Sequence, residues 1–102
     1  MDKNEQFSRI DRMSKMLLKR QELINRLEDV LEELDKDYSC FKELDAYFSS
    51  EERMKDVEDD ENGEIPNTIN RAALSQDELY NLLEDNHDVA VHMVESAIKI
   101  LR

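Results

Sequence analysis

Residues 10–48 read IDRMSKMLLKRQELINRLEDVLEELDKDYSCFKELDAYF, and their apolar side chains return every seven positions. When the stretch is numbered in heptads abcdefg, ten of the twelve a and d positions are apolar. A third apolar column at g widens the stripe to about three residues in seven, which suits a helical bundle better than a two-stranded coiled coil. The stretch therefore predicts one long amphipathic helix. Its a residues are Ile10, Leu17, Ile24, Leu31, Tyr38 and Asp45, and its d residues are Met13, Arg20, Leu27, Leu34, Phe41 and Phe48.

The composition favours an all-α protein. The chain of 102 residues has one Gly, one Pro and no Trp, whereas sheets depend on β-branched and aromatic residues and on Gly-rich turns. A chain of this length is large enough for one hydrophobic core and too small for two. We therefore predict a single helical domain over residues 1–102.

The heptad phase continues through Asp35–Ser39 without a break, so the first helix is predicted over residues 5–48. A break at those weak helix formers is the alternative. A short acidic helix is predicted over residues 50–60, because Ser49 and Glu52 have the spacing of a capping box. Its only apolar side chains, Met54 and Val57, are expected to pack on the bundle.

Gly63 and Pro66 mark a turn in an ordered linker over residues 61–75. Ser75 and Glu78 then form the clearest capping box of the chain and predict a third helix over residues 76–102. We expect the long first helix to pack antiparallel on this third helix, as a helical hairpin or bundle.

The first and third helices differ in length by about 20 Å, so antiparallel packing would leave the N-terminal end of the first helix uncovered. We predict a homodimer with two-fold symmetry that buries this overhang. Bending or fraying of the first helix is the alternative. The candidate interaction surface combines the overhang with apolar residues farther along the chain. Its members are Phe7, Ile10, Met13, Met16, Leu17, Met54, Val57, Ile65 and Tyr80.

No group of residues has the spacing of a catalytic or cofactor site. Glu84 and His87 form Glu-x-x-His, but a di-iron bundle needs a second such motif and facing carboxylates, so His87 is interpreted as a partly buried, hydrogen-bonded histidine. The acidic run 58–65 resembles a calcium loop, yet Ile69 stands where a bidentate Glu is required. Cys40 has little of the cationic surrounding that activates a thiol. We therefore predict no enzymatic activity, no cofactor and no metal.

The net charge of -12 is unevenly distributed: residues 1–20 hold six basic and three acidic side chains, and residues 21–50 hold three basic and nine acidic ones. Because most of the chain repels phosphate, we expect no nucleic-acid binding. No apolar run approaches the roughly 20 residues of a membrane span, and the N-terminus lacks the apolar core of a signal peptide. We expect no membrane association. A single cysteine excludes an internal disulfide and fits a cytoplasmic location.

Three segments of the chain have a familiar pattern: LDAYFSS at 44–50, the acidic run ending in NGEIP at 62–66, and RAALSQDELYNLL at 71–83. On these segments the chain resembles the small bacterial proteins grouped as domain of unknown function forty-two ninety-eight, most specifically between Tyr47 and Leu83. The resemblance implies a cytoplasmic helical protein without an assigned activity. It also suggests, as a hypothesis, that the turn from Asp56 to Leu79 is the family's recognition surface.

The sequence thus predicts a non-enzymatic helical interaction or scaffold module that acts as a homodimer. The alternative is an acidic inhibitor, antitoxin or export chaperone that masks a basic or amphipathic protein partner. A secreted helical hairpin of the Trp-x-Gly class would have a similar length, and Tyr80 and Glu84 have the spacing of its export signal. The chain has no Trp, however, which disfavours that class.

Overall fold

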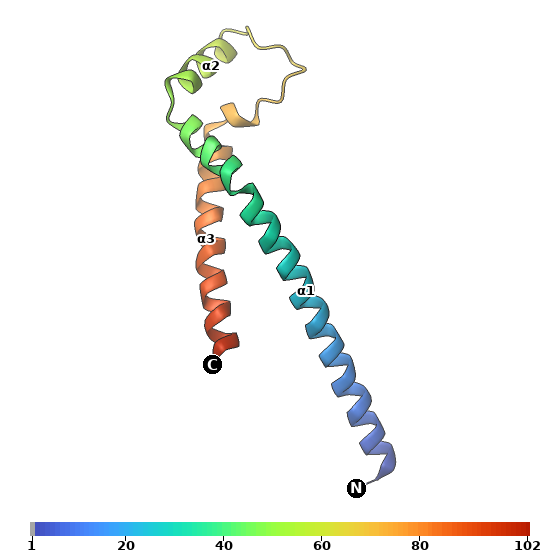
Figure 1. Cartoon of the computed structure of the whole chain (residues 1–102). Helices are drawn as coiled ribbons and strands as arrows, with labels where there is room; N and C mark the ends of the chain where they lie inside the picture. Colours follow the sequence, from blue (N-terminus) through green and yellow to red (C-terminus); the bar gives the residue numbers. More distant parts are fainter. Residues whose placement is uncertain (1) are drawn as a thin grey trace. The chain divides into compact units, whose positions relative to one another are not determined.

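The computed structural model describes residues 2–102, and these form an all-α protein (Figure 1). Three α-helices follow one another: α1 (Lys3–Phe48), α2 (Glu51–Glu61) and α3 (Gln76–Leu101). A short 3₁₀ helix, η1 (Ala72–Leu74), immediately precedes α3. No residue of the described range lies in a β-strand, so the predicted all-α class is confirmed.

Helix α1 is continuous over 46 residues, and the helical phase passes through Asp35–Ser39 without interruption. Asp2 caps its N-terminus: the Oδ1 atom accepts a hydrogen bond from the Asn4 amide at 3.0 Å. Aspartate is favourable there because its oxygen satisfies a free N–H and its charge complements the positive end of the helix dipole. The continuous heptad phase thus predicted the single helix correctly.

Ser50 caps the N-terminus of α2, and its Oγ accepts a hydrogen bond from the Arg53 amide at 3.1 Å. The capping box predicted from Ser49 and Glu52 was therefore displaced by one residue. At the other end Gly63 has a φ of +74°, a left-handed conformation that is open to glycine at little steric cost. The turn predicted at Gly63 is thus present.

Ser75 caps α3, and its Oγ accepts a hydrogen bond from the Glu78 amide at 3.3 Å. This is the cap that the sequence predicted, and α3 begins at Gln76 as expected. None of the helices in the described range combines the length and apolar character that a membrane crossing requires.

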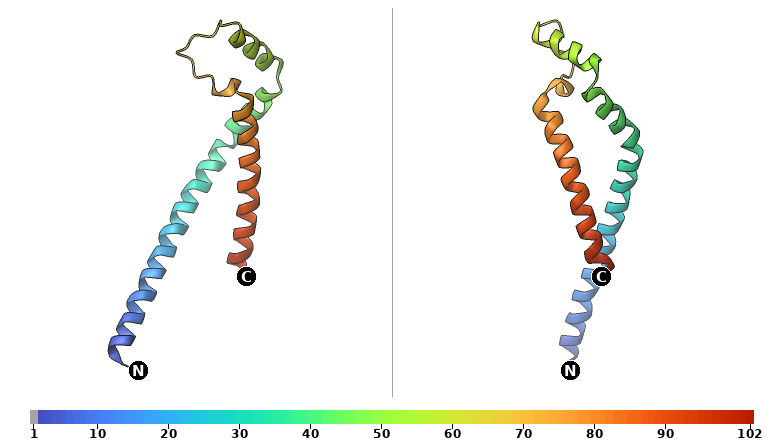
Figure 2. Two further views of the ribbon diagram at one scale, coloured as in Figure 1. Left: turned by 180° about the vertical axis from the view of Figure 1, so that it is seen from behind. Right: turned by 90° about the vertical axis from the view of Figure 1, so that its left-hand side faces the viewer.

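The chain divides into two compact units, a first one that ends at Lys42 and a second one, Glu43–Arg102. The first unit consists of α1 alone up to that residue. In the second unit α2 and η1 contact each other, and η1 contacts α3; Figure 2 shows the loop that returns from α2 to η1 from two further sides. Leu79 at the start of α3 is the buried apolar residue there, with 5% of its surface exposed.

Candidate functional site

The most densely bonded part of the second unit surrounds Arg53, the third residue of α2. Only 9% of Arg53 is exposed, although the side chain is charged. Its Nε donates a hydrogen bond to the carbonyl oxygen of Ala73 in η1 at 3.2 Å. Its guanidinium carbon lies 5.0 Å from the ring centroid of Phe48, within cation–π distance. Arg53 therefore joins the end of α1, α2 and η1.

Tyr47 adds a second link between the end of α1 and α2. Its hydroxyl donates a hydrogen bond of 2.6 Å to Oδ2 of Asp56, and this bond, followed by partial burial, raises the pKa of Tyr47 above its ordinary value. Ser50, between the two helices, donates from Oγ to the Tyr47 carbonyl at 2.7 Å. We call Tyr47, Phe48, Ser50, Arg53, Asp56 and Ala73 the Arg53 clamp.

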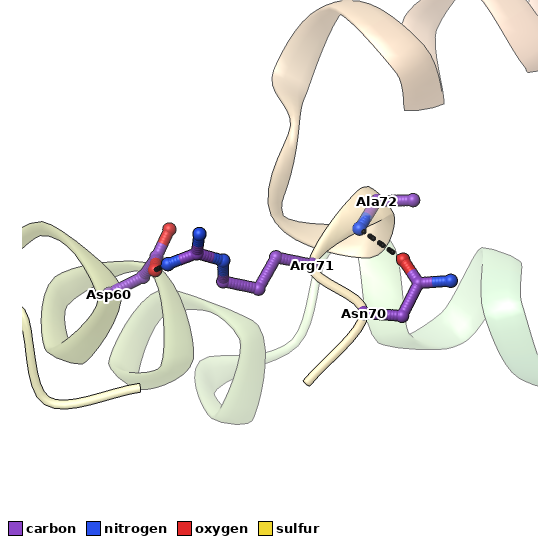
Figure 3. Close-up of polar contacts among 4 residues, drawn as sticks. All are labelled: Asp60, Asn70, Arg71 and Ala72. Atoms are coloured by element: carbon purple, nitrogen blue, oxygen red, sulfur yellow. Dashed lines mark hydrogen bonds and ion pairs between the residues drawn. The ribbon is translucent and has the colours of Figure 1, made fainter. Parts of the chain in front are cut away.

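A third link closes the loop between α2 and η1 (Figure 3). Nη1 of Arg71 lies 3.0 Å from Oδ1 of Asp60 near the end of α2, as an ion pair with a hydrogen bond. In the same turn Oδ1 of Asn70 accepts a hydrogen bond of 3.0 Å from the amide of Ala72, the first residue of η1. The loop is thus tied at the position where it returns to the clamp.

An open groove of about 320 Å³ lies beside the clamp, lined by Leu44, Ala72, Ala73, Glu78, Leu79 and Leu82. Its walls are apolar apart from Glu78. The groove can accept an apolar side chain, whereas the polar side chains of the clamp already have hydrogen-bond partners within the clamp. The second unit thus has an open, mostly apolar groove next to a set of hydrogen-bonded polar side chains.

The predicted interaction surface has members in both units. Its five members in α1, Phe7, Ile10, Met13, Met16 and Leu17, are exposed by 46–60%, and all of them except Phe7 form part of the stripe of the first unit. In the second unit Tyr80 and Met54 are exposed, and Val57 and Ile65 are half-buried. The inward face of α2 is therefore formed by Arg53, Asp56 and Val57, and the expectation that Met54 packs inward was wrong.

The residues whose spacing resembles that of metal ligands, in the Glu-x-x-His motif and the calcium-like run, do not form a metal-binding cluster. In residues 2–102 no three His, Cys, Asp or Glu side chains are placed to hold a metal ion together. His87 is exposed, with Nδ1 3.5 Å from Oδ1 of Asp88. Its predicted partial burial was wrong, because residues 84–95 of α3 are exposed throughout. Asp60 of the calcium-like run pairs with Arg71 instead.

Residues 10–96 match the sequence pattern of the family described as Domain of unknown function (DUF4298). The chain belongs to this family. The resemblance inferred from the three segments between Leu44 and Leu83 is thus confirmed, and the DUF4298 match also includes most of α1 and α3. No curated protein and no solved structure matched the chain in the corresponding searches.

Within the DUF4298 region, sequence reasoning missed Arg53. The available signal was the spacing of Arg53, Asp56, Val57 and Asp60, which places three ionisable groups and one apolar group on one face of α2. Charged residues at such positions are ordinarily assigned to solvent. What places Arg53 inward is the Ala73 carbonyl, 20 residues away in sequence, and no local pattern points to that contact.

Proposed function

We propose that this DUF4298 protein is a non-enzymatic helical interaction module that acts as a homodimer through the apolar stripe of α1. The supporting observation is that the first unit is a single helix, so no second element of that unit covers its stripe. Ile10, Met13, Leu17, Ile24 and Leu27 of this stripe are all about half exposed. Contiguous apolar surface of this kind is a mark of interaction sites.

The antiparallel pairing of α1 with α3 that the sequence predicts is part of the same proposal. The stripe of α1 is three columns wide, which is enough to contact two neighbouring helices. One neighbour would be α3 of the same chain, and the other a second copy. A cytoplasmic location is also proposed, since the chain carries a single cysteine.

Sedimentation velocity at micromolar concentration tests this function. We expect a dimer for the wild-type chain and a monomer for Leu17→Asp, because a charge at an a position would have to be buried at the interface. Leu18→Asp is the matched control: it introduces the same charge next to Leu17, but at a b position outside the stripe. A wild-type chain that sediments as a monomer refutes the proposal.

The second candidate function is the acidic inhibitor, antitoxin or chaperone that masks a basic partner. The net charge of -12 favours it, because charge complementarity speeds association and selects partners. Affinity purification at low and high salt distinguishes the two functions. A single basic protein bound at equal stoichiometry to a monomeric chain, and released by salt, supports masking; self-association without such a protein supports the homodimer.

A further inference from the structure

The charges of α1 are segregated along the helix, and this restricts how two copies of its stripe can meet. The stretch 1–20 carries six basic and three acidic residues. By contrast, positions 32–37 hold Glu32, Glu33, Asp35 and Asp37 with Lys36 as the only cation. Two parallel helices in register would place basic side chains beside basic ones and acidic beside acidic ones, which is repulsive. An antiparallel pair places opposite charges together.

From this charge distribution and the heptad positions, we infer that the occupant of the stripe is α1 of a second copy, antiparallel, with the two-fold axis between Ile24 and Leu27. The inference deepens the proposed homodimer and rests on it. It specifies the interface, the direction of the partner helix and the register.

The register follows from matching the a positions of one helix with the d positions of its partner. When Ile24 lies opposite Leu27, the layers between Ile10 and Phe41 pair apolar residues except the one formed by Arg20 and Leu31, and the outermost layers pair Asp45 with Gln6 and Phe48 with Lys3. The other apolar layers are Leu17 with Leu34, Met13 with Tyr38, and Ile10 with Phe41. A shift of one heptad in one direction keeps the same number of apolar pairs but buries the carboxylate of Asp45 against Met13. A shift in the other direction sets Tyr38 against Gln6 and Phe41 against Lys3. The central register therefore forms at least as many apolar pairs as either shift, and it buries no carboxylate against an apolar side chain.

In the same register most of the flanking charges are complementary, although Arg26 lies level with Arg26 of the second copy beside the two-fold axis. At the c positions Lys19 of one helix lies level with Glu33 of the other, and Arg12 lies close to Asp37 at the neighbouring g position. Two-fold symmetry makes each pair occur twice. A parallel dimer would instead set Lys19 against Lys19 and Glu33 against Glu33.

The single native cysteine provides a direct test of direction and register. Cys40 is free and exposed, so a spin label can be attached to it without any substitution. In the inferred dimer Cys40 is level with Asp11 of the second copy, 29 residues along the helix, so the two labels should be about 44 Å apart at 1.5 Å per residue. A parallel dimer predicts less than about 25 Å, and a one-heptad slip changes the distance by about 10 Å.

A second label position tests which helix forms the interface. In Cys40→Ser with Asn25→Cys the label lies beside the inferred axis, so the two labels should be less than about 25 Å apart. A long distance at position 25 overturns the inference, because the chains would then associate through another surface. A short distance at position 40 also overturns it, although the homodimer itself would stand. A monomeric chain refutes both.

Charge reversal gives an independent readout. Lys19→Glu and Glu33→Lys should each raise the dissociation constant of the dimer roughly tenfold, since each change affects two symmetric pairs. The variant that combines Lys19→Glu with Glu33→Lys should restore the wild-type dissociation constant. Lys36→Glu, with the same change of charge at an outward f position, is the control and should leave the constant within about twofold. Failure of the double variant to recover affinity overturns the antiparallel register.

Discussion

Arg53 shows how a charged side chain is accommodated in a helical joint with little apolar core. A buried guanidinium needs hydrogen-bond partners to offset its desolvation. Here the Ala73 carbonyl accepts a hydrogen bond from Nε of Arg53, and the Phe48 ring lies against one face of the guanidinium group. The planar group serves both contacts at once, which the compact ammonium of lysine cannot do.

We expect Arg53→Ala to lower the free energy of unfolding by about 2 kcal/mol, because it removes a charged hydrogen bond and a cation–π contact and leaves the Ala73 carbonyl without this donor. Arg53→Lys should recover less than half of the loss. Urea denaturation measures both. Lys55→Ala on the exposed side of the same helix is the control, and an equal effect of the two alanine variants would contradict the role of the clamp.

Tyr47 gives the joint a dependence on pH. Its pKa is raised, first by the hydrogen bond to Asp56 and then by burial. A group whose pKa is higher in the folded state stabilises that state while it is protonated. The contribution is therefore complete below the unfolded pKa of about 10 and is lost as the pH rises through the higher folded value.

We expect Tyr47 to ionise above the ordinary tyrosine pKa of about 10 in a titration followed by tyrosinate absorbance, as a late step. Tyr47→Phe should remove the late step and lower the free energy of unfolding by about 1 kcal/mol at neutral pH. The difference in stability between wild type and variant should shrink in strongly alkaline solution. If Tyr38→Phe removes the late step instead, the assignment to Tyr47 is wrong.

At the scale of elements, the helix starts are set by local capping. The caps at Ser50 and Ser75 each satisfy a free amide of the first turn. Ser50 makes a further bond to the Tyr47 carbonyl, so it also joins α2 to the end of α1. We therefore expect the two serines to differ in importance.

Ser75→Ala should cost about 1 kcal/mol of stability, and Ser50→Ala more, because two hydrogen bonds are lost there. Thermal unfolding followed by circular dichroism compares the two variants. Ser14→Ala on the exposed surface of α1 is the control and should be neutral or slightly stabilising, since alanine is the better helix former. A neutral Ser50→Ala would show that its bonds to Tyr47 and Arg53 contribute nothing net.

At the scale of the whole molecule, the stability of a dimer depends on chain concentration, because association is linked to folding. For the homodimer proposed here, a hundredfold rise in concentration should raise the melting temperature by about 5 °C. Leu17→Asp should melt at a temperature independent of concentration. A wild-type melting temperature that does not change with concentration would count against the homodimer.

The helices and most of their ends were predictable because they depend on interactions within a few residues. The a and d columns of α1 repeat with the helical period, the Ser75 cap reaches only to Glu78, and Gly63 supplies its own backbone freedom. The displaced cap at Ser50 arose because two adjacent serines both have suitable side chains. Ser50 rather than Ser49 is the cap because α2 begins at Glu51.

The clamp depended on contacts that span the sequence. Arg53 reaches Ala73 across 20 residues, and Arg71 reaches Asp60 across 11, because the loop after α2 returns to the end of α1. No periodicity or motif encodes the distance between two such groups. Local chemistry thus sufficed for where helices form, whereas the fold of residues 43–102 determined which charged side chains became buried and bonded, since burial depends on what the chain brings alongside.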